Sequence, residues 1–277
     1  MADVTWKLNG LDLDEDLGGY LGAVTVWRPA VSVRGTTIVI PGQHGARRPG
    51  LPVYEEPQVT IQLVRDEVET QSDLEEKVNQ ASALLAQPSL TVTRVSGDLE
   101  TSAVASLVSI AADGFIPGRA GSATALLAVP GVFFRRPVWT SPDLAFAGDV
   151  TSVELAGLSG STAPIPDAVI RITGPRTNPY VTDPSTGTGI FWQGTVAAGQ
   201  HLFLCPKPLS ARLSANAADW LSGGTDVSGA VSFPAAGRLQ MWPVVQTATT
   251  RKVLVSATGT GGTAASKLAV RAQGSHL

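Results

Sequence analysis

Short stretches in which apolar and polar residues alternate recur along most of this chain of 277 residues. Val59 to Val64 shows the pattern, since Val59, Ile61 and Leu63 share one side of an extended chain. A period of two residues is typical of a half-buried β-strand. We therefore predict two or three strands within Val24 to Ile40, and further strands at Val59 to Val64, Leu90 to Val95, Ala103 to Ala111 and Ser122 to Val129, with a turn-rich connection from Asp113 to Gly121 before the last of them.

One stretch has the period of a helix instead. Its apolar residues recur at intervals of three or four positions, at Leu74, Val78, Ala81 and Leu85. Ser72 and Glu75 have the spacing of a capping box, and Pro88 ends the pattern. The sequence thus predicts a single helix over Ser72 to Gln87 that packs one face on a sheet.

The segment at 41–58 interrupts the strands. It is rich in proline and glycine, which predicts a long exposed loop and no regular structure. Loops of this length inside a compact domain are uncommon unless they have a function, and contact with a neighbouring subunit is one such function. Its charged residues, Arg47, Arg48, Glu55 and Glu56, either are solvated or pair across a subunit interface.

The composition changes near residue 145, after which glycine, serine, threonine, alanine and proline dominate and acidic residues become rare. We therefore predict two domains, at 1–145 and 146–277. The second domain has short alternating runs at the spacing of a β-sandwich of jelly-roll type. They lie at Val169 to Thr173, Gly189 to Trp192, His201 to Leu204, Arg238 to Val245 and Lys252 to Ala257.

Composition and charge exclude several classes of protein. Apolar residues make up 43% of the chain and charged residues 16%, which excludes a disordered chain and suits a subunit of an assembly. A net charge of −3 disfavours sequence-reading recognition of nucleic acid. The single cysteine, Cys205, excludes an internal disulfide framework and fits synthesis in a reducing cytoplasm. The first residues lack the apolar stretch of a signal peptide, and Ala123 to Phe134 is too short to span a bilayer, so we expect no membrane insertion.

No residue pattern predicts a metal, a cofactor or catalysis. Asp12, Asp14 and Asp16 alternate as in a calcium loop, but Leu17 stands where the turn needs glycine, so a solvated loop is the favoured interpretation. The three histidines, His44, His201 and His276, lack any metal-ligand spacing. Ser159 has no histidine partner in sequence, and Cys205 is interpreted as a small buried hydrophobic residue.

Three tryptophans of the second domain are candidates for stacking on sugar rings: Trp192, Trp220 and Trp242. Trp192 and Trp242 lie within predicted strands, where one face is core. Burial is therefore the favoured role for at least these two.

The stretch from Gly160 to Leu204 carries a resemblance. It combines an apolar strand entry after Pro164 and Pro166, a turn at Gly174 to Pro179 that contains Asn178, and later glycine turns at Gly187 and Gly199. In this order the motifs resemble the C-terminal, galectin-like domain of the siphophage distal tail protein family. The first domain is similar to that family in outline, through the turn at Ile40 to Gly45, the single helix, and Pro130 to Pro137 before the junction.

The resemblance implies a structural protein of the virion tail tip and no enzyme. It implies a homohexameric ring whose N-terminal domains, barrel-like and of the tail-tube type, continue the tube through which DNA passes as cargo. The outer domains would bind tail-tip hub or receptor-binding proteins, and the ring would bind the tail tube protein. The protein would be made in the cytoplasm of a host bacterium. Two other classes stay open, a carbohydrate-binding adhesin and a tail tube or hub subunit, and a β-rich hydrolase is disfavoured because no catalytic constellation is present.

Overall fold

The computed structural model of the chain describes residues 4–13, 21–24, 30–34, 38–39, 46–47, 51–66 and 68–277. The chain divides into two compact units, an N-terminal unit of Met1–Phe134 with Leu277 and a C-terminal unit of Arg135–His276. The division lies about ten residues before the boundary predicted near residue 145. The reason is strand pairing, which composition does not report: β12 (Phe134–Thr140) pairs with the last strand of the chain, β25 (Lys267–His276), before the composition changes.

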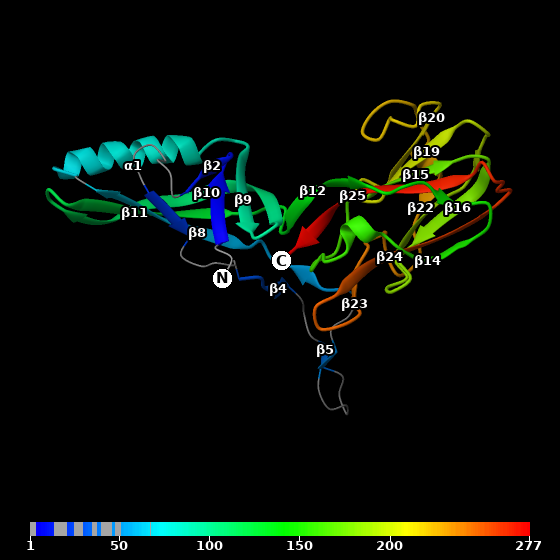
Figure 1. Ribbon diagram of the computed structural model, residues 1–277, viewed down its shortest axis with the longest axis horizontal. Helices are drawn as coiled ribbons and strands as arrows, with labels where there is room; N and C mark the ends of the chain where they lie inside the picture. The colour runs from blue at the N-terminus through cyan, green and yellow to red at the C-terminus, as the bar shows by residue number, and fades with distance from the viewer. Residues whose placement is uncertain are drawn as a thin grey trace. The chain divides into compact units, whose positions relative to one another are not determined.

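The N-terminal unit contains an antiparallel sheet with one α-helix among the described residues, so the prediction of mostly β structure with a single helix is confirmed (Figure 1). Neighbouring strands of this sheet pair in the order β2-β1-β9-β10-β11-β8-β3. The strands are β1 (Val4–Leu8), β2 (Leu11–Asp12), β3 (Leu21–Val24), β8 (Gln58–Asp66), β9 (Leu90–Ser96), β10 (Leu99–Ile116) and β11 (Ala120–Ala128).

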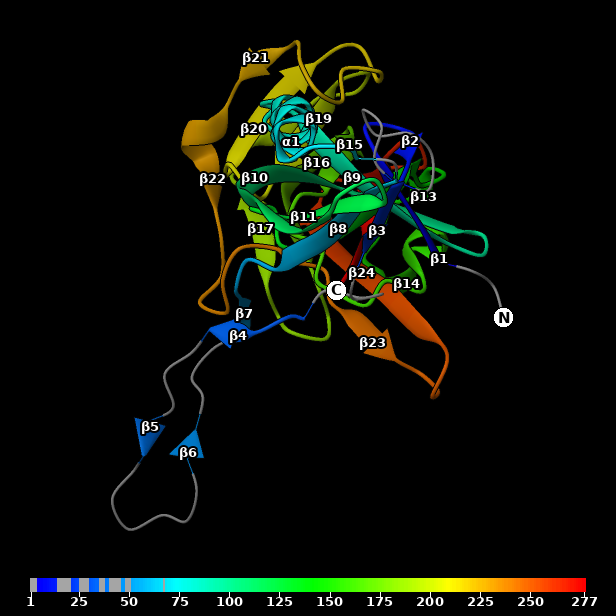
Figure 2. The same ribbon diagram turned by 90° about the vertical axis from the view of Figure 1, so that its left-hand side faces the viewer.

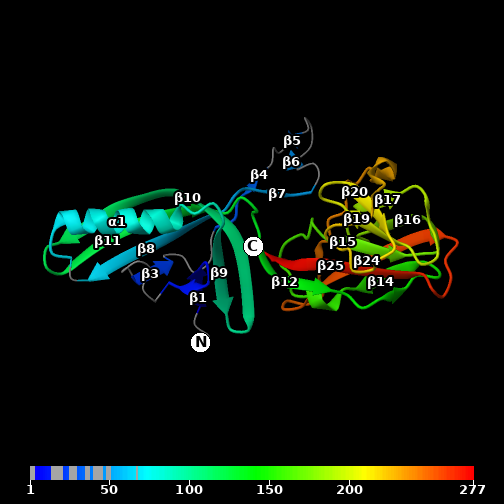
Figure 3. The same cartoon turned by 90° about the horizontal axis from the view of Figure 1, so that it is seen from above.

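The helix α1 (Gln71–Leu85) lies along β10 and β11 (Figure 3). Its buried residues, Leu74, Ala81 and Leu85, pack against a core that includes Ile61 of β8 and Leu127 of β11. Burial of this one face supplies most of the stability of such a helix.

The predicted helix cap is wrong by two residues. Thr70 and not Ser72 is the N-cap, because the Thr70 hydroxyl accepts a hydrogen bond from the Asp73 backbone N–H while the Asp73 carboxylate accepts one from the Thr70 N–H. Two possible capping boxes overlap in the sequence, and the structure uses the earlier one. The helix therefore begins at Gln71.

The predicted connection between Asp113 and Gly121 is also wrong, because strand structure continues through most of it. β10 extends to Ile116 and β11 begins at Ala120, so only three residues form the turn. The register between β10 and β11 shifts at Leu107/Ser109 and at Ala112/Gly114, and the second shift leaves Asp113 unpaired, so a residue of the predicted turn is accommodated within the strand.

Part of the segment predicted as an irregular loop has paired strands. β5 (Ile38–Val39) pairs with β6 (Ala46–Arg47), and β4 (Val33–Arg34) pairs with β7 (Val53–Tyr54), both antiparallel (Figure 2). The paired residues include none of the prolines of the segment, which explains why a proline-rich stretch can still pair here. We call these four strands, 33–54, the hairpin arm.

The C-terminal unit is a β-sandwich of two antiparallel sheets, as predicted (Figure 1). Its first sheet has the order β12-β25-β15-β19-β20-β21, with β13 paired to β25, and its second has the order β14-β24-β16-β17-β22, with β18 and β23 at its sides. The remaining strands are β13 (Leu144–Ala145), β14 (Val150–Glu154), β15 (Val169–Thr173), β16 (Arg176–Thr182), β17 (Gly189–Trp192), β18 (Thr195–Val196), β19 (His201–Cys205), β20 (Ser210–Ser214), β21 (Thr225–Asp226), β22 (Val231–Ser232), β23 (Pro243–Val245) and β24 (Arg251–Thr260); short 3-10 helices lie at Ala156–Leu158 and Ser228–Ala230.

The strand predicted over Arg238 to Val245 is much shorter than expected. Only Pro243–Val245 forms β23, because side chains bind the backbone before it. The buried Asp183 carboxylate accepts a hydrogen bond from the Trp242 N–H at 2.8 Å, and the Thr188 hydroxyl donates to the Gln240 carbonyl at 3.0 Å. Such side-chain partners compete with a strand ladder.

Arg176 is the largest fully buried side chain of the unit, with 1% of its surface exposed. Its guanidinium donates to the carbonyl oxygens of Phe146 and Ala147 at 3.0 Å and of Gly148 at 3.2 Å, and lies 3.9 Å from the Phe146 ring centre. Burial lowers the pKa of Arg176, whereas the nearby Asp149 carboxylate, 3.6 Å away, opposes that shift. The hydrogen bonds fix residues 146–149, which lead from β13 in one sheet to β14 in the other.

We predict that Arg176→Met destabilises the C-terminal unit by on the order of 3 kcal/mol, because the buried Phe146 carbonyl and the part-buried carbonyls of Ala147 and Gly148 lose their donor. The free energy of unfolding is measured by urea titration with tryptophan fluorescence, since four of the six tryptophans lie in this unit. Asp149→Asn is the control: its side chain is 63% exposed, so its loss costs less than about 1 kcal/mol. Equal effects of the two substitutions would contradict the role given to the carbonyl contacts.

Candidate functional site

The three tryptophans proposed for sugar stacking do not form a common exposed platform. Trp192 and Trp220 are 4% and 7% exposed, and Trp242 is half-buried. The Trp192 ring N–H donates to the Val227 carbonyl at 3.2 Å, and its ring packs in the sandwich core. The arrangement favours the packing role for Trp192 and Trp220.

Trp220 anchors a loop, residues 215–224, onto the outer face of the first sheet. Its ring meets the Phe203 ring edge-on at 5.7 Å, and the Arg171 guanidinium lies 4.9 Å from its centre. Arg212 donates to the carbonyl oxygens of Trp220 at 3.2 Å and Gly223 at 2.9 Å. The loop is therefore held by both ring packing and charge-assisted hydrogen bonds. Its next residue, Leu221, is 76% exposed.

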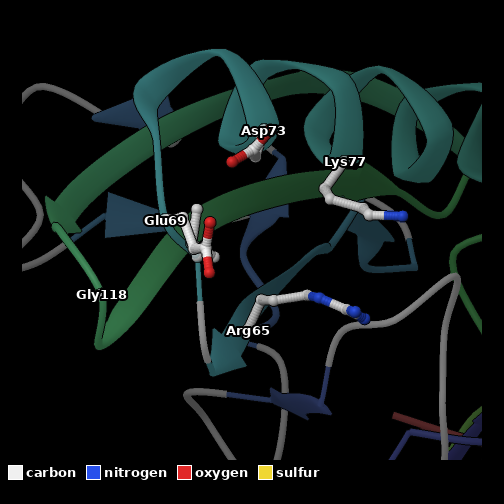
Figure 4. A pocket seen from close by; sticks show the side chains of 6 residues that line it. Arg65, Glu69, Asp73, Lys77 and Gly118 are labelled. Carbon is white, nitrogen blue, oxygen red and sulfur yellow. The ribbon is translucent and has the colours of Figure 1, made fainter.

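The N-terminal unit has an open cleft of about 510 Å³ beside the first turn of α1, lined by Arg65, Val68, Glu69, Asp73, Lys77 and Gly118. Figure 4 shows that the Arg65 and Lys77 side chains extend to the same side, away from Glu69 and Asp73. Two cations and two carboxylates balance one another, so the cleft has no preference for an ion of one sign. Such a mixed rim is typical of polar contacts between proteins. The sequence analysis missed this cleft, because β8 and α1 bring its residues together only in the fold.

The four residues proposed for subunit contact lie on or beside the hairpin arm. Arg47 is in β6, Glu55 and Glu56 follow β7 and are exposed, and Arg48 lies outside the described residues. The base of the arm is attached to its own unit, since the Tyr54 and Phe133 rings meet edge-on at 5.6 Å.

The candidate metal residues are described only in part. Asp12 pairs with Lys7 at 3.1 Å, while Asp14, Asp16 and His44 lie outside the described residues. Within the described ranges no group of three or more His, Cys, Asp or Glu side chains could hold a metal ion. Nor is any helix of those ranges long and apolar enough to cross a membrane.

The nucleophile candidates are in ordinary structural surroundings. The Ser159 hydroxyl donates to Glu154 at 2.9 Å, and hydrogen bonds from Lys252 and Ser159 lower the pKa of Glu154. Cys205 is half-buried at the end of β19. Burial, and to a smaller extent the positive charge of Arg171, lower the pKa of His201, whose ring shares a hydrogen bond with Thr173. The partner of the Ser159 hydroxyl is thus a carboxylate that also pairs with Lys252, and not a histidine.

We predict that Trp220→Ala lowers the stability of the C-terminal unit by about 3 kcal/mol or more, because a buried ring leaves a cavity. Leu221→Ala is the matched control, because Leu221 is the next residue and its side chain is exposed. We expect it to change the free energy of unfolding by less than about 0.5 kcal/mol. Urea unfolding checks both. A stable Trp220→Ala variant that had lost affinity for a glycan would instead support the stacking role.

No protein-family model matches the sequence, and no curated protein matches it either. Solved structures do match. The Dit (gp 19.1) protein of phage SPP1, described as a paradigm of the hub adsorption apparatus in phages that infect Gram-positive bacteria, matches with a TM-score of 0.60 at 12% identity over 99% of this chain and 100% of that one. A chain of the phage P2 baseplate in its activated conformation with Ca matches at 11% identity over 98% of both chains, but its TM-score of 0.41 does not establish a shared fold.

The match to the SPP1 protein includes both units of this chain, since it extends over nearly every residue. The likeness of fold therefore extends over the N-terminal sheet with its helix and over the C-terminal sandwich. At this identity the likeness concerns the fold alone. The chain thus has the fold of the phage distal tail protein, as the resemblance in its turns and strands predicted.

Proposed function

We propose that this chain is a structural protein of a phage tail tip, which forms a hexameric ring between the tail tube and the proteins that bind the host. The observation that carries the proposal is the likeness of fold to the SPP1 hub protein over the whole length of both chains. A match of two successive domains in order is more specific than a match of one common β-sandwich. In this proposal the protein has no turnover, and its function depends on its subunit interfaces.

One sheet face of the N-terminal unit is an argument for the proposed passage of DNA. The residues of β8, β11 and β10 that alternate with the buried ones stand side by side in the register, as in the rows Gln62–Thr124–Ala111 and Thr60–Leu126–Ser109. These six residues are uncharged, and the acidic groups next to them are Asp66 and Asp113; the Thr124 hydroxyl donates to Asp113. We infer that this face lines the opening of the ring, where a surface without cations would not retain DNA.

The hairpin arm is an argument for assembly of the proposed ring. It carries the basic residues Arg34 and Arg47, and the acidic residues Glu55 and Glu56 follow it directly. Of its described side chains, Val33, Arg34 and Val53 are exposed, and its base is attached by Tyr54. In the proposed ring the arm contacts the next copy through Arg47, Arg48, Glu55 and Glu56. Heterologous contacts of this kind close into a ring when the rotation between copies is right.

The experiment that tests the ring is mass measurement by light scattering combined with cryo-electron microscopy of the full chain. We expect particles of six 28.6 kDa chains with a central opening lined by β8, β10 and β11. A chain that stays monomeric at all concentrations, alone and with a tail tube protein, would overturn the ring. A monomer that binds glycans would favour the adhesin instead.

The DNA path has its own prediction. In assembled rings, Gln62→Lys with Ser109→Lys places cations on the face proposed to line the opening, and we expect the Kd for a short DNA duplex to fall by about tenfold or more. Gln71→Lys with Asn79→Lys adds the same charge on exposed positions of α1 and is the matched control. Fluorescence anisotropy at low salt measures both. Equal affinity of the two double variants would show that the sheet face is not on the DNA path.

A further inference from the structure

The two units of the chain carry opposite net charge. Residues 1–134 hold 9 Lys and Arg and 16 Asp and Glu, a net charge of −7, whereas residues 135–277 hold 11 and 7, a net charge of +4. The total of −3 hides this difference. A surface with one sign of charge attracts partners of the other sign.

The positive charge of the C-terminal unit is not neutralised within the unit. All seven of its carboxylates have internal partners. Four form ion pairs, Asp167 with Arg135, Asp143 with Arg171, Asp149 with Arg176 and Glu154 with Lys252. The other three, Asp183, Asp219 and Asp226, accept hydrogen bonds from their own loops. The remaining cations therefore have no carboxylate left to pair with inside the unit.

One of these cations stands beside an apolar cavity on the outer face of the first sheet. The cavity, of about 150 Å³, is lined by Val138 of β12, Val169 of β15, Arg271, Ala272 and Gln273 of β25, Asp167, and Leu221 of the 215–224 loop. Val169 and Arg271 are direct cross-strand neighbours. Val138 and Leu221 are 52% and 76% exposed. The volume is several times the ~30 Å³ of a water molecule, so the cavity can hold one aliphatic side chain.

The residues around this cavity are held in place by strand pairing and by side-chain packing. Its floor is a strand pair, and one wall is Leu221, which follows the buried Trp220 anchor. Asp167, another lining residue, is held by Arg135 at 2.6 Å through one oxygen, while its other oxygen is buried and has no hydrogen-bond partner among the described residues. An apolar cavity beside a cation has the chemistry to bind an aliphatic side chain and a carboxylate together.

We propose that this cavity, which we call the Leu221 cavity, is the docking site for an acidic peptide segment of another tail-tip protein. The segment inserts an aliphatic side chain between Leu221 and Val138 and pairs an adjacent carboxylate with Arg271. The proposal rests on the proposed function, since it names where the C-terminal unit binds its partner and what chemistry that partner has. The net charge of +4 selects an acidic partner over a basic one.

The test is selection of random peptides displayed on yeast against the full chain, followed by Kd measurement with the enriched peptides. We expect them to share an aliphatic residue next to Asp or Glu. Arg271→Glu and Leu221→Ser each raise the Kd of these peptides by about tenfold or more. Arg251→Glu and Val245→Ser are the matched controls, since they make the same changes at a cation and an exposed apolar residue of the other sheet, and leave the Kd unchanged.

Three outcomes overturn the proposal. This site would be excluded if the enriched peptides lacked acidic residues, or if neither Arg271→Glu nor Leu221→Ser changed their Kd. Polyphosphate that competes with the peptides and is weakened by Arg271→Glu but not by Leu221→Ser would indicate a site for anionic polymers. Loss of the ring in Leu221→Ser, measured by light scattering, would make the cavity an interface between copies. Rings that form without peptide binding defeat this inference alone, whereas peptide binding by a permanent monomer defeats the ring alone.

Discussion

Three of the connections by which the chain passes between the sheets of the sandwich meet at the guanidinium of Arg176. The first is residues 146–149, whose carbonyl oxygens it binds. The second is the link from β15 to β16, which ends at Arg176 itself. In this link the Pro175 carbonyl accepts a hydrogen bond from the Ser266 hydroxyl at 2.6 Å. The third is the link from β24 to β25, where a side chain at Gly262 would lie 2.1 Å from the guanidinium. Backbone carbonyls at such crossings cannot join a sheet ladder, and the Arg176 guanidinium supplies donors to three of them. β25, which the third connection leads into, then forms the floor of the Leu221 cavity.

The sequence was sufficient for the secondary structure that depends on periodicity. The helix at 71–85 and the strands at 58–66, 169–173 and 201–205 agree with their predictions to within a few residues, because burial of one face imposes a period on the chain. Features set by single side chains were not predictable in the same way. Thr70 and Ser72 both begin a possible capping box, and no pattern separates them. Likewise, Asp183 and Thr188 form hydrogen bonds with the backbone of Trp242 and Gln240, which lie about sixty and fifty residues further along the chain. Only the fold brings these groups together.

The candidate sites were harder to predict than the fold, because surface function depends on which residues the topology brings together. Tryptophans drew attention as sugar platforms, yet Trp220 is buried and its exposed neighbour Leu221 carries the apolar surface. Arg271 and Val169 are about a hundred residues apart in sequence and adjacent in register. What the sequence does contain is the separation of charge, since the scarcity of acidic residues after residue 145 is visible without coordinates. The ion pairs and hydrogen bonds that already engage those few carboxylates are visible only in the fold.

The opposite charges of the two units fit one physical requirement of the proposed ring. DNA is a polyanion, and a cation near its path would hold it with an affinity that grows with each phosphate contact. An N-terminal unit of charge −7, with a sheet face free of cations on β8, β10 and β11, avoids this. A protein partner needs the reverse, a surface that attracts and then retains it. The C-terminal unit meets that need because its carboxylates are paired internally, which leaves cations such as Arg271 available beside an apolar cavity. Placing the two tasks in separate units allows each surface to carry the sign of charge that its own contact requires.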